Sequence, residues 1–180
     1  MLNNLSIHKT TLDGVLLITP PTVHHDQRGT YIETWNQDMY RMAAIQNGLP
    51  LIDWVQDDVS VSSRYVLRGI HGDQTTWKLI TCLYGRIFLV VVNNDPDSLQ
   101  YRKSLGIRLV FETPLQVLVP PKFGVGHLVL SDYAVFGYKQ SSYYDRAGQF
   151  TLTWNDPTLG IQWPLPVGVI PITSERDRGV

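Results

Sequence analysis

Arg68, His71 and Lys78 lie close together in the sequence, and their side chains combine three kinds of chemistry. A histidine titrates near neutral pH, so it can remove a proton from carbon and pass it on. The planar guanidinium of an arginine binds two oxygens of a diphosphate at once, and the compact charge of a lysine can stabilise an enolate oxygen. The combination predicts proton transfer on a small anionic substrate. The alternative for His71 is a half-buried histidine on a strand, bonded to a carboxylate.

His127 is the second candidate, because it follows a glycine-rich loop whose close turn can present the ring inward. It either contacts the substrate or is a structural histidine bonded to the backbone. His71 and His127 are poor candidates for metal ligands. Jelly-roll metal sites generally use an HxH pair on one strand, and the residue two positions after His71 is Asp73. His24 and His25 are adjacent, so on a strand their rings would point to opposite faces. We therefore expect no metal site.

Tyrosines supply the acid candidates. Tyr138 lies inside an expected strand, so its ring can project into the interior of a sheet. Tyr143 and Tyr144 lie at or beyond the end of that strand. A phenol can act as an acid opposite a base. The alternative for each ring is simple packing with a solvated hydroxyl group.

Short β-branched or aromatic runs, separated by Gly, Pro, Asn and Asp, dominate the rest of the chain. We expect strands at 15–19, 29–35, 54–61, 78–83, 86–92, 105–111, 116–119, 127–130, 134–139 and 151–154. One short helix is expected at 37–46, ended by Asn47-Gly48. So many short strands predict an all-β sandwich or jelly roll with a pocket at its mouth or between its sheets. The Pro-rich tail at 163–171 is expected to wrap the surface and carry 174–177 back to the body.

Composition limits the classes of function. The 180 residues are 43% hydrophobic, which suits one domain over residues 1–180. The net charge of -1 leaves no basic footprint for nucleic acid. No apolar run approaches the ~20 residues that a membrane span needs, and the start of the chain lacks signal-peptide features, so we expect a cytoplasmic protein. Cys82, the single cysteine, excludes an intramolecular disulfide and is expected to be a buried core thiol.

Taken together, the motifs resemble the dTDP-4-dehydrorhamnose 3,5-epimerase family, whose fold is a cupin-type jelly roll. The matching motifs, in family order, are Asp26-x-Arg28-Gly29-x-Tyr31-x-Glu33, Gln56 to Ser60, Leu67-Arg68-Gly69-Ile70-His71, Lys78-Leu79, Pro120 to His127, Tyr138-Lys139 with Tyr143-Tyr144, Trp154-Asn155-Asp156, Ile161-x-Trp163-Pro164 and Ser174-x-x-Asp177. Each motif is weak alone, and their order and spacing make the resemblance specific. It covers most of the chain.

The resemblance implies the catalytic roles. His71 would be the general base, with Asp177 orienting and charging it. Tyr138 would be the acid on the opposite face of the sugar, and Tyr144, nearer the nucleotide, is the second choice for that role. Lys78 would stabilise the enolate oxygen at C4.

It also implies the substrate contacts. Arg68 would bind the diphosphate with His127 close by, and Gln56 would contact the substrate. Arg28 and Glu33 would reach the nucleotide from the partner subunit of a homodimer. Family members need no metal and no redox cofactor. The expected activity is epimerisation of a dTDP- or GDP-linked 4-keto-6-deoxy sugar at C3, C5 or both, in deoxysugar biosynthesis for capsule or lipopolysaccharide.

This sequence departs from the common family pattern at several positions. Gly72 and Asp73 replace an aromatic residue and a glutamine just after His71. Asp58 replaces an asparagine, and an added carboxylate near phosphates would repel them. The segment from His71 to Lys78 is similar to a subgroup that acts on GDP-linked 6-deoxy-4-keto-heptoses. The nucleotide base, the size of the sugar and the number of inverted centres therefore stay open.

Three alternatives compete with epimerisation. A metal-dependent cupin oxygenase or isomerase would need the HxH pair that is missing. A non-catalytic sugar-binding jelly roll would tolerate loss of the base or the acid, but both are present. A nucleotide-sugar 3,4-ketoisomerase shares the jelly roll and would shift the keto group. The segments 138–144 and 174–177 favour the epimerase.

Overall fold

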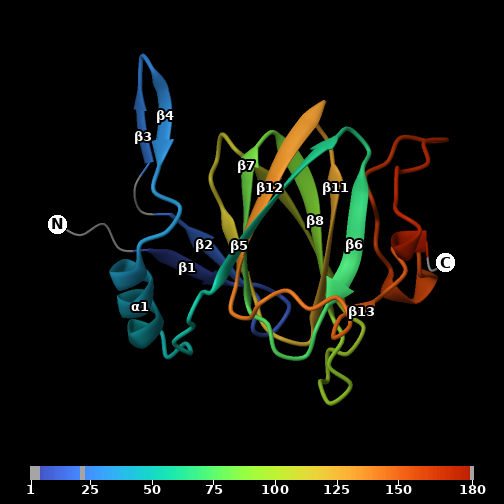
Figure 1. The fold of residues 1–180 in the computed structure, drawn as a ribbon, viewed down its shortest axis with the longest axis horizontal. Helices are drawn as coiled ribbons and strands as arrows, with labels where there is room; N and C mark the ends of the chain where they lie inside the picture. Colours follow the sequence, from blue (N-terminus) through green and yellow to red (C-terminus); the bar gives the residue numbers. More distant parts are fainter. Residues whose placement is uncertain (1–4, 21–22, 179–180) are drawn as a thin grey trace.

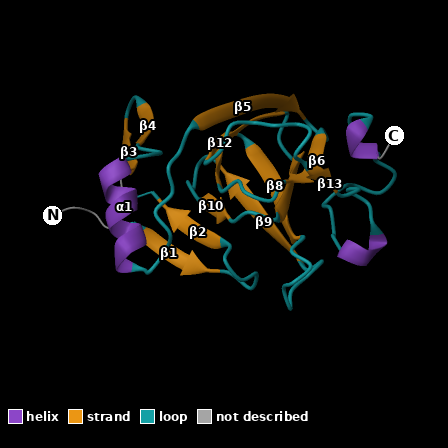
Figure 2. Ribbon diagram, turned by 60° about the horizontal axis from the view of Figure 1, so that its bottom comes forward, coloured by secondary structure: helices purple, strands orange, loops and turns teal. Residues whose placement is uncertain are grey.

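Two β-sheets packed face to face form the body of the protein, with one α-helix at one end (Figures 1 and 2). The computed structural model describes residues 5–20 and 23–178. The expected all-β fold is confirmed. None of the helices in these described ranges is long and apolar enough to cross a membrane.

Eleven strands form the two sheets, and two more form a separate hairpin. The larger sheet has the order β1 (Ser6–Lys9), β2 (Leu16–Thr19), β10 (Gln116–Val119), β7 (Lys78–Tyr84), β12 (Tyr133–Gln140) and β5 (Gln56–Ser63). The second sheet has the order β13 (Phe150–Thr151), β6 (Leu67–Gly72), β11 (Phe123–Val129), β8 (Arg86–Asn93) and β9 (Ser104–Val110). The hairpin consists of β3 (Val23–Asp26) and β4 (Gly29–Ile32).

The eight strands from β5 to β12 follow the jelly-roll order. Consecutive strands alternate between the sheets, except for the hairpin of β8 and β9, so that β5-β12-β7-β10 faces β6-β11-β8-β9. The expected jelly roll is therefore confirmed. Strands β1, β2 and β13 only extend the edges of the two sheets.

Alternation along the strands builds the core between the sheets. Ile80, Ile87 and Leu89 are fully buried there, because every second side chain of a strand points to the same face. Cys82 belongs to the same cluster, and burial raises the pKa of its thiol to about 11, which confirms the expected core thiol.

The helix α1 (Gln37–Gln46) has the expected bounds. The Asn36 side chain accepts a hydrogen bond from the backbone N–H of Met39 at 3.2 Å, which caps the first turn. Gly48, in the left-handed conformation with φ of 65°, follows its last turn. The helix lies beside the N-terminal strands at one end of the sandwich (Figure 1).

The sequence pattern does not predict three of the strands: β1, β3 and β6. Strand β6 carries two glycines and two polar side chains among six residues, so its composition does not indicate a strand. Its pairing with β11 decides its conformation. Gly69 has φ of 107°, and a Cβ atom there would lie 2.5 Å from the carbonyl oxygen of Val125, so only glycine fits.

Several expected strand ends were also wrong. Strand β11 starts at Phe123 instead of residue 127, because Gly124 and Gly126 obscured the alternation. The strand expected at 29–35 ends at Ile32, and the one expected at 151–154 is reduced to Phe150–Thr151.

The C-terminal tail returns to the body as expected. Ile172 forms a parallel bridge with Val66, and its carbonyl accepts a hydrogen bond from Leu67 N at 2.9 Å. Two 3-10 turns, η1 (Pro157–Leu159) and η2 (Arg176–Arg178), complete this region. The tail thus delivers Asp177 to the side of β6.

Candidate active site

A cavity of about 610 Å³ opens between the two sheets. Polar side chains of β5 form part of its wall. Eight of the ten predicted site residues line it: Gln56, Arg68, His71, Lys78, His127, Tyr138, Tyr144 and Asp177. A smaller hollow beneath α1 is lined mainly by apolar side chains and contains none of the predicted site residues. The large cavity is therefore the candidate active site.

His71 and Asp177 form a pair on one wall of this cavity. Nε2 of His71 lies 2.8 Å from Oδ1 of Asp177, a close polar contact in which this nitrogen makes no aligned hydrogen bond among the described residues. The hydroxyl of Ser174 donates to Oδ2 of Asp177 at 2.8 Å, and Gly69 N donates to Oδ1 at 3.3 Å. These contacts hold the carboxylate in place.

The charge state of Asp177 follows from its surroundings. Burial acts to raise its pKa, but the side chains of His71 and Ser174 and the backbone of Gly69 outweigh burial and hold the pKa below its usual value. Asp177 is therefore an anion beside the imidazole. Such an anion orients the ring and stabilises its protonated form.

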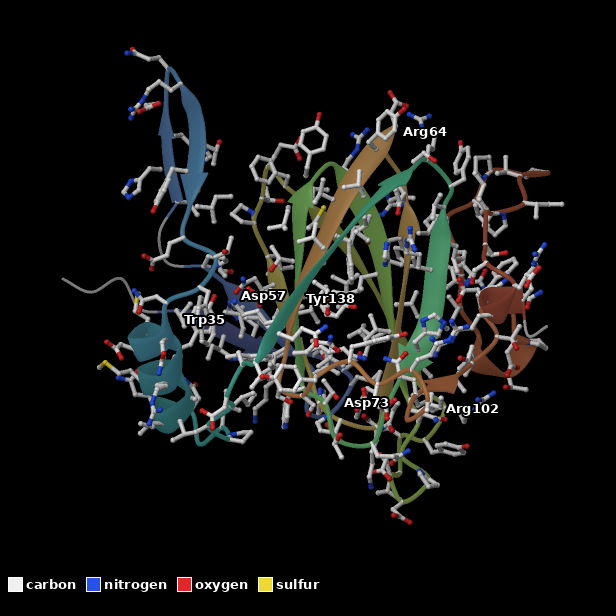
Figure 3. The ribbon with its side chains drawn as sticks, viewed as in Figure 1. Trp35, Asp57, Arg64, Asp73, Arg102 and Tyr138 are labelled. Carbon is white, nitrogen blue, oxygen red and sulfur yellow. The ribbon has the colours of Figure 1, made fainter. Side chains whose placement is uncertain are left out.

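Tyr138 reaches the cavity from the opposite sheet. It lies on β12, near the centre of the molecule (Figure 3). Burial raises the pKa of Tyr138 to about 12, Asp58 and Tyr144 add to the effect, and Arg68 opposes it. The phenol therefore keeps its proton at neutral pH, as an acid must.

The two other tyrosines differ in position. Tyr144 is half exposed, lines the cavity, and donates its backbone N–H to Oε1 of Gln56 at 2.8 Å. Tyr143 is mostly exposed and does not line the cavity. Tyr138 and Tyr144 are thus the phenols available to a ligand.

Lys78 is a buried cation at the first residue of β7. Burial lowers its pKa, the carboxylate of Asp73 at 3.9 Å acts in the opposite direction, and Arg176 adds to the lowering. Asp73 is itself held by the backbone N–H groups of Thr75 and Thr76, at 3.0 Å and 2.7 Å. Asp73, which follows His71 in the sequence, therefore supports the charge of Lys78.

Arg68 and His127 lie together on β6 and β11. Nε of Arg68 donates to the hydroxyl of Ser62 at 3.1 Å. The ring of His127 stacks on Phe136 with centroids 4.1 Å apart, and burial together with the charge of Arg68 lowers its pKa to about 3. Its Nε2 has no hydrogen-bond partner among the described residues. His127 is thus neutral, and this nitrogen is not satisfied by the backbone.

Arg28 and Glu33 do not reach the cavity of their own chain. The hairpin of β3 and β4 projects beyond the body of the molecule (Figure 1). Arg28 is exposed there and pairs with Asp26 at 2.5 Å, and Glu33 directly follows β4. Within one chain, these two residues therefore lie apart from the other eight.

Two further charged residues line the cavity: Arg176, which sequence reasoning missed, and Asp58, which it noted only as a departure from the family pattern. Asp58 is two positions after Gln56, so the alternation of β5 could have placed both on the inner face. Arg176 precedes Asp177 and donates to Thr151 and Gln149 at 3.0 Å and 3.1 Å. Within 5–20 and 23–178, no group of three or more His, Cys, Asp or Glu side chains is arranged to hold a metal ion.

Comparison with known proteins adds a family match. The sequence model of the dTDP-4-dehydrorhamnose 3,5-epimerase family matches residues 9–180. Enzymes of that name from Methanothermobacter thermautotrophicus and Escherichia coli K12 are 37% and 36% identical to this chain. These alignments cover 94% and 92% of the chain and 90% and 89% of the two relatives.

A solved structure has the same fold. The crystal structure of dTDP-6-deoxy-D-glucose-3,5-epimerase from Legionella pneumophila, in complex with dTDP-4-keto-L-rhamnose, superposes with a TM-score of 0.88 at 32% identity. The superposition covers 98% of this chain and 91% of that chain.

Proposed function

Because this chain belongs to the dTDP-4-dehydrorhamnose 3,5-epimerase family and is a nucleotide-sugar epimerase, we propose that it uses His71 as base and Tyr138 as acid on a dTDP-linked 4-keto-6-deoxyhexose. One observation carries the proposal. The pair of His71 and Asp177 and the phenol of Tyr138 line the same cavity from opposite sheets. A sugar held between them has the base on one face and the acid on the other.

The chemical steps follow from this arrangement. The 4-keto group acidifies the hydrogens on C3 and C5. Since Nε2 of His71 faces Asp177, Nδ1 accepts the proton from carbon, and the carboxylate stabilises the imidazolium. The electron pair of the broken C–H bond moves to the C4 oxygen, where the charge of Lys78 stabilises the enolate.

Inversion requires a proton from the other face. Tyr138 gives its phenolic proton to the carbon, and the new C–H bond uses the electron pair of the enolate. The phenolate then takes a proton from water, and His71 releases the proton it removed. No net proton is gained or lost, so base, acid and oxyanion stabilisation account for the whole reaction.

We further propose that the nucleotide of the substrate is dTDP. The relatives carry dTDP in their names, and the Legionella pneumophila structure contains a dTDP-linked 4-keto sugar. These relatives favour dTDP over the GDP-linked heptose that the segment from His71 to Lys78 also resembles. Arg68 is the proposed diphosphate contact, with His127 beside it. Gln56 and Tyr144 lie together at the position proposed for the nucleotide.

The projecting hairpin favours a homodimer. A two-stranded hairpin is marginal by itself in water, so an exposed one that carries Arg28 and Tyr31 gains from a second surface. We assign that surface to the rim of the partner subunit's cavity, where Arg28 and Glu33 would add a charge of each sign. Each subunit then completes the site of the other.

The competing functions make different demands. A metal-dependent oxygenase or isomerase would lose activity after chelation, whereas the proposed enzyme retains it. A 3,4-ketoisomerase would yield a product with the keto group at C3. Proton NMR in deuterated water separates all of these, with a panel of dTDP- and GDP-linked 4-keto-6-deoxy sugars.

The expected result is deuterium at C3, C5 or both, together with inverted coupling constants and an unmoved keto group. The centres that exchange also identify which carbons the enzyme handles. Exchange that needs added metal, or migration of the keto group, would contradict the proposal.

A further inference from the structure

Strand β5 turns polar side chains toward the cavity, while its two valines face solvent. Asp58 and Ser60 point inward, while Val59 and Val61 are 61% and 64% exposed on the outer face. The hydroxyl of Ser60 has no hydrogen-bond partner in the part of the chain that the structure describes. A strand with this reversed pattern lines a ligand site instead of a core.

Two neutral amides hold the carboxylate of Asp58. Nε2 of Gln56 donates to its two oxygens at 3.0 Å and 2.9 Å, and Nε2 of the buried Gln140 donates to Oδ2 at 2.6 Å. Among the described residues, no lysine or arginine forms an ion pair with Asp58. The carboxylate is therefore rigid, and its negative charge is not neutralised by a cation.

The neighbouring Asp57 shows the contrast. It lies on the outer face of β5 and pairs with Lys139 at 2.8 Å. The two aspartates thus share a strand, and only Asp58 keeps an uncompensated charge that faces the cavity.

Strand pairing places Asp58 beside the proposed acid. Asp58 is directly opposite Tyr138 in the antiparallel pairing of β5 and β12. Arg68 contacts Ser62, four residues further along β5, which is about 13 Å at the usual rise of a strand. The cavity therefore has a cationic end at Arg68 and an anionic position at the level of Tyr138.

Two other basic side chains of the cavity, Lys78 and Arg176, make contacts away from Asp58. Lys78 faces Asp73 at 3.9 Å, and Arg176 donates to Gln149. A nucleoside diphosphate sugar fits this polarity in one direction, with the diphosphate at Arg68 and the neutral sugar between His71 and Tyr138.

We propose that Asp58 is a specificity-determining residue, which makes the cavity select a nucleoside diphosphate sugar over the free nucleoside diphosphate. This inference rests on the proposed function for the position of the sugar beside Tyr138 and of the diphosphate at Arg68. A hydroxyl group of the sugar donates a charge-assisted hydrogen bond to the carboxylate. A free nucleoside diphosphate has no such donor, and its terminal phosphate carries an additional negative charge that Asp58 repels.

The test is equilibrium binding of dTDP and of dTDP-glucose, measured by calorimetry on the intact protein. Wild-type protein is expected to bind dTDP-glucose more tightly than dTDP. Asp58→Asn keeps the size of the side chain and removes the charge, so it should weaken dTDP-glucose binding by about tenfold, the effect of losing a hydrogen bond to a charged group. It should also strengthen dTDP binding, because the repulsion is gone.

Asp57→Asn is the matched control, since it removes a carboxylate from the same strand on the outer face and should change neither affinity. Asp58→Ser is the second variant and should act in the same direction as Asp58→Asn. Equal loss of both ligands in the Asp58 variants would indicate a merely structural role and overturn the proposal. A wild-type preference for dTDP would overturn it without any variant.

The two proposals can fail separately. dTDP-glucose has no 4-keto group, so its binding reports selectivity without turnover. An Asp58-dependent preference in a protein that exchanges no sugar hydrogen would reject only the epimerase mechanism. Normal epimerisation with an unchanged preference in Asp58→Asn would reject only the role of Asp58.

Discussion

The carboxylate of Asp177 lies 2.8 Å from Nε2 of His71, although the two residues are far apart in the sequence, one on β6 and the other in the C-terminal turn η2. The hydroxyl of Ser174 and the backbone of Gly69 fix the carboxylate, so the C-terminal tail forms part of the candidate active site. A tail that detaches would take the counter-charge of the base with it. The proposed activity therefore depends on a segment with almost no regular secondary structure.

His71→Asn is expected to lower both solvent exchange at the sugar carbons and epimerisation by about a thousandfold, the contribution of a general base. Nucleotide binding should stay within a factor of about two, because the diphosphate is assigned to Arg68. Proton NMR in deuterated water and calorimetry with dTDP give the two readouts. His8→Asn, at an exposed position on β1, serves as the control. Exchange that persists in His71→Asn would remove this residue as the base.

Tyr138→Phe is expected to slow inversion more than exchange. The proton can still leave through His71, whereas the opposite face has lost its donor. We expect inversion to fall by about a hundredfold and exchange by less than about tenfold. NMR measures both rates in one sample. Equal loss of the two rates would count against the acid role, and an active Tyr138→Phe with an inactive Tyr144→Phe would transfer that role to Tyr144.

Mixed dimers test the assignment of the hairpin. The double variant Arg28→Ala, Glu33→Ala keeps the base His71, but its hairpin no longer supplies charged groups to the partner's cavity. The variant His71→Asn keeps a functional hairpin but has no base. Each should be inactive alone. Their random mixture, after dissociation and reassembly, should regain roughly a quarter of wild-type activity, because half of the dimers then contain one complete site. An absence of recovery in a mixture shown to contain mixed dimers would contradict a shared site.

Asp73→Asn is expected to move the alkaline limb of the kcat profile to lower pH. The Asp73 carboxylate raises the pKa of Lys78 against burial and Arg176, so its removal lowers that pKa further. Lys78 then loses its charge at a lower pH, and the enolate is no longer stabilised above that pH. The amide oxygen of asparagine can still accept from Thr75 and Thr76, so the loop is retained. Asp132→Asn, at an exposed ion pair with Arg64, should leave the profile unchanged.

His127 should make the protein less stable in mild acid. Burial and Arg68 lower its pKa to about 3 in the folded state, against 6.5 for a free side chain. The unfolded chain therefore binds a proton that the folded one does not. The free energy of unfolding therefore has its full value above about pH 6.5 and decreases as the pH falls toward about 3. The decrease due to His127 is about 2 kcal/mol from pH 6.5 to pH 5.

Urea unfolding at the two pH values tests this dependence. His127→Gln cannot titrate, so its free energy of unfolding should change less between them, whatever its absolute stability. His8→Gln, at an exposed position, should retain the wild-type slope. An identical slope in His127→Gln and wild type would show that His127 does not titrate on unfolding.

Much of the fold was predictable because its signals are local. Alternating β-branched residues and turn residues predicted most strands, and Asn36 with Asn47-Gly48 bounds a helix that was predicted with the correct ends. Strand β6 was not predicted, because Gly69 and Gly72 have no strand preference of their own. Its conformation comes from the neighbouring strand β11, which no local pattern reports.

The sequence by itself determined the chemical types in the site and the family that carries them, since motif order and side-chain identity are properties of the chain. Only the tertiary structure decided which of these groups meet. It brings Asp177 to His71, sets Tyr138 on the opposite sheet, and leaves Arg28 on a hairpin outside the cavity. It also turns Asp58 inward and Asp57 outward, because neighbouring side chains of a strand point to opposite faces. Contacts between distant segments depend on packing of the whole chain, and for that reason they are absent from any local pattern.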